Sequence, residues 1–191
     1  MIREQIRPAL LSFVLLTLLT GVAYPVLVTG ISQTLFKNQA NGSLIFKDGK
    51  PMGSELIGQP FDDPKYLWGR SSATSPTYNA SSSSGSNYGP MNPDYLKVVE
   101  ARMKGLKASD PGNATPIPVD LVTASASGLD PHISLAGAYY QVPRIARTRG
   151  ISENAVKTVI QKNIQGRFMK VIGEPVVNVL KVNLDLDSYK Q

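Results

Sequence analysis

The chain has 191 residues, a length that suits one folded domain plus a short appendage. It contains no cysteine and a single histidine, which excludes disulfides, thiol nucleophiles and clusters of imidazole metal ligands. The formal charge of +6 fits a solvated surface with a mild excess of lysine, and the alternative is an anionic partner.

An uncharged apolar run over residues 9–31 predicts a transmembrane helix. At about 1.5 Å per residue the run reaches roughly 34 Å, enough to cross a hydrocarbon core of about 30 Å. Arg3 and Arg7 precede the run and no basic cluster follows it closely, so the positive-inside rule places residues 1–8 in the cytoplasm and residues 32–191 outside. We therefore expect a single-pass protein whose partners include the lipid bilayer and exclude nucleic acid.

The alternative to a retained anchor is a cleaved signal peptide with a small-residue site near Ala23. The apolar run continues to Ile31, however, which is too long for an ordinary signal sequence. Two residues inside the span, Gly21 and Pro25, leave a notch and remove one backbone hydrogen bond. They are candidate positions for packing against a neighbouring helix, and ordinary membrane-helix composition is the other explanation.

The remainder predicts one α+β domain in which helices pack on a small mixed sheet. Turn residues, loop composition and apolar spacing define its first half. The expected order is a hairpin with an Asp-Gly turn over 46–51, a long Ser/Gly/Asn-rich loop over 71–93, a helix over 93–106 that a turn at 110–113 ends, and a short strand over 117–123.

The second half contains two serine caps. Ser134 is expected to begin a helix that runs to Arg149 with a kink at Pro143, and Ser152 is expected to begin the next helix. Over residues 180–186 leucine and valine alternate with polar residues, which predicts a final strand with one buried face.

Signatures of catalysis are missing from the sequence. It has no phosphate loop, no G-x-S-x-G and no S-x-x-K, so no catalytic site is predicted. No metal site is predicted either, and the sequence leaves cofactor-binding residues unknown. A serine triad would need His132, which we interpret as a capping or packing residue. Residues 81–87 fit either a plain loop or an anion-binding nest of backbone N–H groups.

Three arginines gather near the end of the helix expected after Ser134, namely Arg144, Arg147 and Arg149. One interpretation is favourable interaction with the helix dipole. The other is a dock for carboxylates of a partner, and the sequence leaves both open.

Several blocks carry a resemblance. They are residues 53–59 with YLWGRSSAT at 66–74, Tyr78-Asn79 with SGSNYGP at 84–90, DLVTASASGLDPHIS at 120–134, and GEPVVNVL at 173–180. Together with the N-terminal anchor they resemble, over the whole chain, the C subunit of the bacterial Kdp-type potassium-transporting P-type ATPase, the KdpC family.

The resemblance implies an accessory subunit, not an enzyme on its own, in the cell (inner) membrane of a bacterium. The implied partners are an ATP-hydrolysing pump subunit and a potassium-channel-like subunit, which handle ATP and potassium, so this chain needs no cofactor. The absence of a D-K-T-G sequence agrees with that role. The resemblance further implies a catalytic chaperone that raises the ATP affinity of the pump subunit. Because the topology places the domain outside, direct contact with ATP would need the inverted topology, whereas coupling through the membrane helices would not. The sequence leaves direct ATP contact open.

We expect the loop 71–93 and the segment 125–134 to form one partner surface, because the loop is too long for a simple connection. The alternative for both segments is a set of fold-defining turns. The candidate contact residues are Tyr78, Asn79, Asn87, Tyr88, Ser127, Asp130 and His132. A membrane-anchored extracytoplasmic hydrolase and a module that binds lipid or cell wall are the alternative functions.

Overall fold

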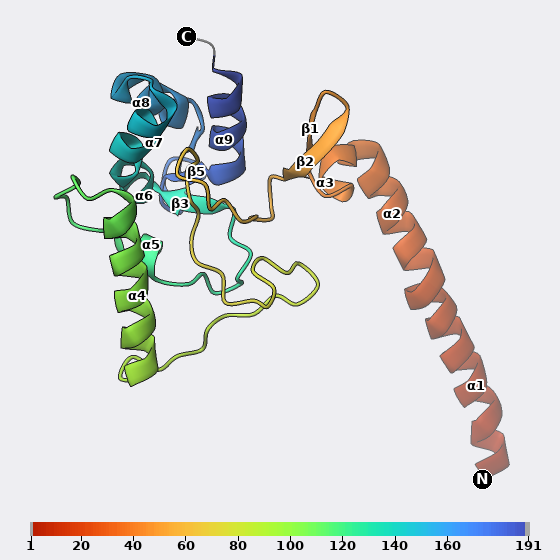
Figure 1. The fold of residues 1–191 in the computed structure, drawn as a ribbon. Coiled ribbons are helices and arrows are strands. Elements are labelled where there is room, and N and C mark those ends of the chain that lie inside the picture. Colours follow the sequence, from red (N-terminus) through yellow and green to blue (C-terminus); the bar gives the residue numbers. More distant parts are fainter. Residues whose placement is uncertain (1, 190–191) are drawn as a thin grey trace. The chain divides into compact units, whose positions relative to one another are not determined.

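The computed structural model of the chain describes residues 2–189 and contains two compact units, the first ending at Leu44 and the second beginning at Ile45. The first unit is helical (Figure 1), with α1 at Ile2–Leu18, a π-helical turn at Leu19–Ala23, α2 at Tyr24–Leu35 and α3 at Lys37–Ala40. Residues 4–35 are long and apolar enough to cross a membrane, with a mean hydropathy of 2.2 and no buried residue. The expected N-terminal apolar helix is confirmed.

The π-helical turn lies in the middle of this helix, where Tyr24 N–H donates to the carbonyl of Leu19. Gly21 lies inside the turn, and Pro25 is at the start of α2. In a regular α-helix the proline ring would clash with the carbonyl four residues earlier. The wider turn accommodates the ring and keeps the helix continuous.

A hairpin of β1 at Leu44–Lys47 and β2 at Lys50–Ser54 opens the second unit, with the first residue of β1 counted in the first unit. The two turn residues, Asp48 and Gly49, have φ values of 51° and 73°, as a type I′ turn requires. The expected hairpin is therefore confirmed. A long irregular stretch follows and includes most of the loop 71–93, which has no helix or strand up to residue 92.

The central sheet has three strands in the order β3-β5-β4, with β3 at His132–Ser134, β4 at Ile164–Gln165 and β5 at Val176–Asn178. Both pairings are antiparallel, so the expectation of a mixed sheet is wrong. Ile133 and Val177 face each other across the first pair and are almost completely buried. These short strands contribute Ile133 and Val177 to the hydrophobic core.

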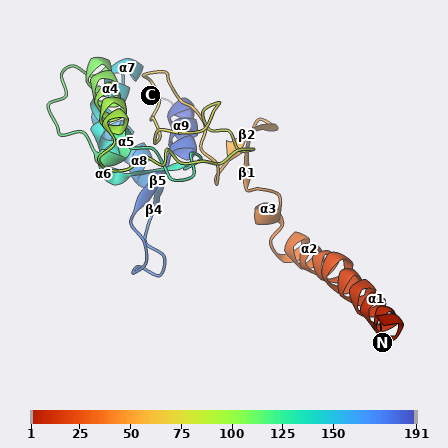
Figure 2. The same cartoon turned by 90° about the horizontal axis from the view of Figure 1, so that it is seen from below.

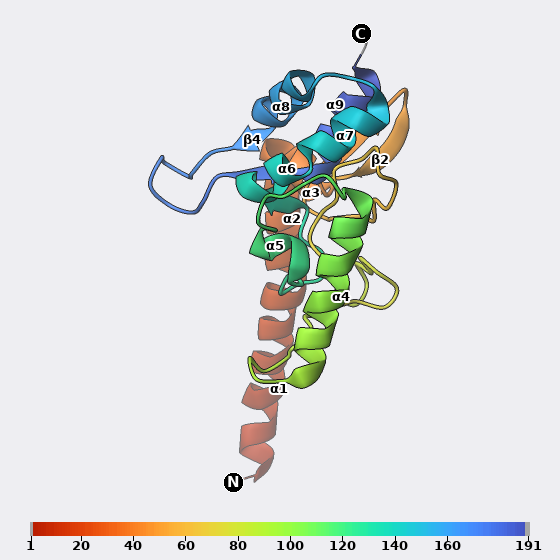
Figure 3. The same cartoon turned by 60° about the vertical axis from the view of Figure 1, so that its left-hand side comes forward.

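Helices complete the unit (Figures 1 and 3). They are α4 at Pro93–Ser109, α5 at Val119–Val122, α6 at Leu135–Tyr140, α7 at Val142–Arg149, α8 at Glu153–Lys162 and α9 at Val179–Ser188. Helix α8 packs against both α7 and α9, while α4 packs against α5. Ser152 caps α8 by accepting from Ala155 N–H, as expected. The expected helix after residue 93 is confirmed too, and it ends where the turn at 110–113 begins.

The expected helix from Ser134 to Arg149 is present in two pieces. Ser134 caps the first by accepting a hydrogen bond from Gly137 N–H at 2.9 Å. The chain breaks at Gln141, one residue before α7, because Pro143 fits only the first turn of a new helix. The second piece ends at Gly150, which has a φ of 67°.

Two expected strands are helices. Residues 180–186 belong to α9, whose buried side chains Val179, Val182, Asn183 and Leu186 follow helical spacing. The alternation of apolar and polar residues predicted a strand because Asn183 was counted as solvent-exposed, whereas it is 1% exposed. The expected strand over 117–123 contains the single turn α5, where the consecutive residues Leu121 and Val122 are both buried.

An extended segment, residues 66–70, runs through the core without strand neighbours. Asn183 accepts from Leu67 N–H at 2.8 Å and donates to Leu67 C=O at 2.9 Å. Gln141 holds the next residue in the same way, with 2.9 Å to Trp68 N–H and 3.1 Å to Trp68 C=O. Two buried amides therefore replace the sheet ladder, satisfying buried backbone groups and fixing the direction of the chain toward Arg70.

A hairpin tip lies between β4 and β5 and projects away from the helices (Figure 2). Met169 and Lys170 form its turn with positive φ. Phe168, Val171 and Ile172 beside them are between 63% and 76% exposed. The second unit therefore presents an ordered apolar tip to its surroundings.

Candidate functional site

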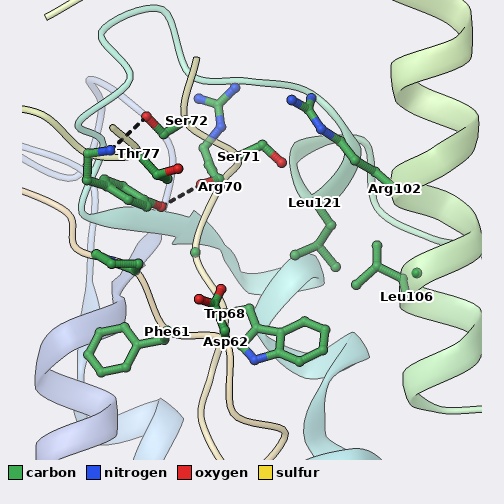
Figure 4. Close-up of a pocket in the computed structure, with 14 residues that line it drawn as sticks. Phe61, Asp62, Trp68, Arg70, Ser71, Ser72, Thr77, Arg102, Leu106 and Leu121 are labelled. Carbon is green, nitrogen blue, oxygen red and sulfur yellow. Dashed lines mark hydrogen bonds between the residues drawn. The ribbon is translucent and has the colours of Figure 1, made fainter. Parts of the chain in front are cut away.

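A cleft of about 420 Å³ lies between the extended segment and helix α4 (Figure 4). Its volume is within the range of ligand-binding pockets, about 300–1,000 Å³. The lining includes aromatic side chains, two arginines and several small polar residues. They are Pro60, Phe61, Asp62, Trp68, Gly69, Arg70, Ser71, Ser72, Thr77, Tyr78, Arg102, Gly105, Leu106 and Leu121.

Tyr78 closes one side of the cleft and is held tightly. Its hydroxyl donates to the carbonyl of Arg70 at 2.5 Å. A Cβ atom at Gly58 would lie 2.5 Å from the ring, and one at Gly69 would lie 2.9 Å from the hydroxyl, so both positions require glycine. Burial, with a further contribution from Asp130, raises the pKa of Tyr78 to about 12. The phenol is therefore protonated and serves as a fixed donor.

The first part of the loop 71–93 is ordered by its own side chains. Ser72 Oγ accepts from Thr74 N–H and Tyr78 N–H at 3.2 and 3.1 Å. Thr74 Oγ1 accepts from Asn79 N–H at 2.9 Å, and Asn79 Oδ1 accepts from Ser81 N–H at 3.1 Å. Local hydrogen bonds of this kind give a loop a defined shape without a sheet or helix.

The loop lies beside the segment 125–134. Ser125 N–H donates to the carbonyl of Ser71 at 3.1 Å, and Ser84 N–H donates to the carbonyl of Ser127 at 3.0 Å. Ser83 Oγ donates to the same Ser127 carbonyl at 2.9 Å. The structure therefore brings the two segments together, whereas their contact with a partner stays a prediction.

Of the seven candidate contact residues, Asn87 and Tyr88 are exposed, and so is Ser127. The ring of Tyr88 lies 5.9 Å from that of Tyr95 on α4. Tyr78 and Asn79 are half-buried; the Tyr78 hydroxyl donates to the carbonyl of Arg70, just before the loop, and Asn79 donates to the carbonyl of Ser75 inside it.

Asp130 and His132 lie beside Arg70. Asp130 accepts from His132 N–H at 2.9 Å and pairs with Arg70 at 3.2 Å. His132 lies in β3, with Nδ1 3.8 Å from Asp130. Its Nε2 is buried without a hydrogen bond among the described residues. It is therefore a packing residue and not a helix cap, because Ser134 caps α6.

The two arginines of the cleft are in different electrostatic situations. Arg70 pairs with Asp130 and also donates to the carbonyl of Ala124 at 3.2 Å. Arg102 donates to the carbonyl of Val122 at 2.9 Å, and within the described part of the chain no carboxylate pairs with it. Burial lowers the pKa of Arg102 because desolvation disfavours the charged form, while the nearby Tyr88 and Tyr95 act in the opposite direction.

Sequence reasoning missed both arginines. Arg102 follows Val99 by three residues and precedes Leu106 by four, so it shares the buried face of α4. A cation on an apolar helix face is the signal that points to it. Nothing local marks Arg70, because its partner Asp130 is 60 residues away.

The three arginines of α7 bind within the fold, with Arg144 in the first turn and Arg147 and Arg149 in the last. Arg144 is 2% exposed, and its guanidinium stacks on Trp68 at 3.8 Å while donating to the carbonyls of Pro64 and Tyr66. Arg147 pairs with Asp110 at 2.7 Å, and Arg149 pairs with Asp187 at 2.8 Å.

Burial lowers the pKa of Arg144 to about 10. The three side chains join α7 to distant parts of the unit, so the interpretation as an open dock for partner carboxylates is wrong.

The cleft favours binding over bond cleavage. Within residues 2–189 no group of histidine and carboxylate side chains could hold a metal ion. The Ser72 hydroxyl is hydrogen-bonded to Thr74 and to backbone N–H groups, not to a general base. An activated nucleophile needs such a base within reach.

Comparison with known proteins identifies the family. The family profile described as "K+-transporting ATPase, c chain" matches residues 6–188. The chain is 62% identical to the potassium-transporting ATPase KdpC subunit of Methylibium petroleiphilum, covering 97% of this chain and 98% of the relative. It is 58% identical to that of Methylococcus capsulatus, covering 98% and 99%. The chain thus belongs to the KdpC family and is a subunit of the potassium-transporting ATPase complex, not its catalytic subunit.

Proposed function

We propose that the chain assembles and stabilises a high-affinity, ATP-driven potassium import complex, in contact with the ATP-hydrolysing subunit and the potassium-channel-like subunit. The observation that carries this proposal is the match to KdpC subunits over nearly the whole chain, anchor included. ATP and potassium are handled by the partners, while this chain acts on them by contact. In this role it is a catalytic chaperone that raises the ATP affinity of the pump subunit.

The proposed partner surface consists of the loop 71–93 and the segment 125–134. In our proposal Asn87, Tyr88 and Ser127 touch the partner, because they are exposed. Tyr78, Asn79, Asp130 and His132 act behind them by holding the loop and the segment in place. A loop that is ordered before binding loses little conformational entropy on association, which favours affinity.

The apolar hairpin tip of residues 168–172 supports a role inside an assembly. Met169 and Val171 are 77% and 76% exposed. Monomeric soluble proteins rarely expose contiguous apolar patches of this kind, and such patches mark contacts with proteins or membranes.

The proposed topology places residues 1–8 in the cytoplasm, the helix 9–31 in the bacterial cell membrane and residues 32–191 outside. The support is the apolar helix and the position of the two N-terminal arginines in the sequence. The effect on ATP affinity would then pass through the membrane helices, with Gly21 and Pro25 as packing positions. Protease added from outside should digest the chain beyond residue 32, and resistance of that part would contradict the topology.

Co-purification of the full-length chain in mild detergent tests the proposed function. The chain should bring the two large pump subunits with it, and its deletion should abolish potassium-stimulated ATPase activity of the complex. The purified chain alone should hydrolyse no ATP. Tyr88→Ala should weaken assembly, whereas Tyr189→Ala, which removes a similarly exposed tyrosine elsewhere, should not. Recovery of the chain free of any pump subunit would contradict an accessory role.

A further inference from the structure

One end of the cleft gathers hydrogen-bond donors that the fold does not use. Figure 4 shows the guanidinium groups of Arg70 and Arg102 on the same side of the cleft, with the Ser71 side chain between the two arginine side chains in this view. Arg102 uses one nitrogen, Nη1, in its hydrogen bond to Val122. Arg70 Nε is buried without a hydrogen-bond partner in the described part of the chain. Arg70 Nε is too deeply buried to reach a ligand, so the remaining donors of Arg102 are those that favour an anionic ligand.

At this end of the cleft Arg102 lacks a counterion among the described residues, whereas the carboxylate of the lining, Asp62, lies away from it beside Trp68 (Figure 4). Arg70 is already paired with Asp130 at 3.2 Å. Arg102 has no paired carboxylate among residues 2–189, and it is partly desolvated by burial. A partly buried cation without a counterion is unfavourable, so an incoming anion gains both the attraction and relief of that cost. A single carboxylate balances one guanidinium, whereas a phosphate chain would bring more negative charge than the cleft neutralises.

Apart from the exposed carboxylate of Asp62, the other half of the cleft is mainly apolar. Phe61 and Trp68 contribute aromatic rings, and Leu106 and Leu121 contribute aliphatic side chains from α4 and α5. An apolar or aromatic group next to the carboxylate would pack there and gain about 25 cal/mol for each Å² removed from water. The lining therefore fits a carboxylate attached to an apolar neighbour.

We propose that the cleft holds an acidic segment of a partner subunit, with an aspartate or glutamate carboxylate at Arg102 and Ser71 and the adjacent apolar side chain against Trp68. The proposal rests on the proposed function and names the chemistry of one contact. The cleft is continuous with the proposed partner surface, since Ser71, Ser72, Thr77 and Tyr78 belong to both. That continuity favours a protein segment over a free small molecule.

The first test uses the full-length chain assembled with its pump subunits in mild detergent. Arg102→Glu should lower the fraction of the chain retained in the complex at least tenfold, because the carboxylate would meet a like charge. Arg102→Gln should lower retention less and should reduce its sensitivity to salt. Lys104→Glu is the matched control, since it makes the same charge change at an exposed position of the same helix and should retain the chain as wild type does.

The second test does not depend on a charge change. A photoreactive side chain fits at Gly105, which lines the cleft and has open space around its Cβ position. In the complex it should cross-link to a pump-subunit peptide that contains aspartate or glutamate. The same group at Gly112, which is equally open but outside the cleft, should not capture that peptide.

The outcomes separate the two proposals. If the wild-type chain does not co-purify with pump subunits, the proposed function fails. If it does, but Arg102→Glu is retained like Lys104→Glu and Gly105 yields no pump-subunit cross-link, the cleft proposal alone fails. If Arg102→Glu lowers the melting temperature of the free chain, its loss from the complex could reflect unfolding. The cross-link at Gly105 then decides whether the cleft proposal holds. If benzoate raises the melting temperature in an Arg102-dependent manner and no cross-link forms, the ligand is a small carboxylate, which overturns the partner segment.

Discussion

Replacing Asn183 by leucine tests whether its side-chain amide supports the extended segment through the two hydrogen bonds to Leu67. Leucine has nearly the shape of asparagine, so the change removes hydrogen bonds without opening a large cavity. It leaves Leu67 N–H and C=O, which Asn183 satisfies at 2.8 and 2.9 Å, without partners in a fully buried position. Each unsatisfied buried group costs about 1–3 kcal/mol. Allowing for the favourable burial of leucine, we expect a loss of about 2–4 kcal/mol in the free energy of unfolding.

Thermal unfolding of the full-length chain in detergent measures this loss. For a chain of this size, 1 kcal/mol corresponds to about 2–4 °C, so the melting temperature should fall by roughly 10 °C. Asn154→Leu is the matched control, because Asn154 is exposed in the first turn of α8. It should move the melting temperature by no more than a degree or two. Equal melting temperatures for the two variants would refute the view that Asn183 supports the segment.

Three further predictions concern Tyr78 and two residues that pack behind the cleft lining, Gly58 against Tyr78 and Arg144 against Trp68. Gly58→Ala should destabilise the chain by about 1–3 kcal/mol in thermal unfolding, because the new Cβ would lie 2.6 Å from the carbonyl of Asp130; an unchanged midpoint would contradict this contact. Because burial raises the pKa of Tyr78 from 10.0 to about 12, wild-type stability should fall as pH rises through that window. Tyr78→Phe should flatten this fall in denaturant titrations at several pH values, and identical slopes would argue against a buried phenol. Arg144→Lys should cost about 2–4 kcal/mol, because an ammonium loses the stacking on Trp68 and the forked donors; wild-type stability would show that charge alone suffices.

Local chemistry made some elements predictable from the sequence. The Asp-Gly pair identified the hairpin because both turn residues need positive φ. The serines at 134 and 152 identified helix starts because their hydroxyls satisfy free N–H groups. Each of these signals acts within four residues, so no tertiary information is needed to interpret it.

The sequence-based predictions were wrong where a contact with a residue far away in the sequence determines the structure or the exposure of a side chain. Asn183 looks like a solvated strand residue until Leu67, 116 residues earlier, is placed beside it. The arginines of α7 looked available to a partner until Trp68, Asp110 and Asp187 were placed against them. The cleft depends on the same kind of contact, because Arg70 and α4 meet only in the folded unit.

The π-helical turn has a consequence for how the apolar helix meets its neighbours. A π turn holds one residue more than an α turn, and each residue advances an α-helix by about 100°. Side chains that continue the α-helical spacing of α1 into α2 therefore face a direction rotated by about that angle. A straight neighbouring helix that follows the side chains of α1 loses register beyond Leu19–Ala23. The two halves of the helix consequently present different faces, so that two different neighbouring helices can pack, one against each half.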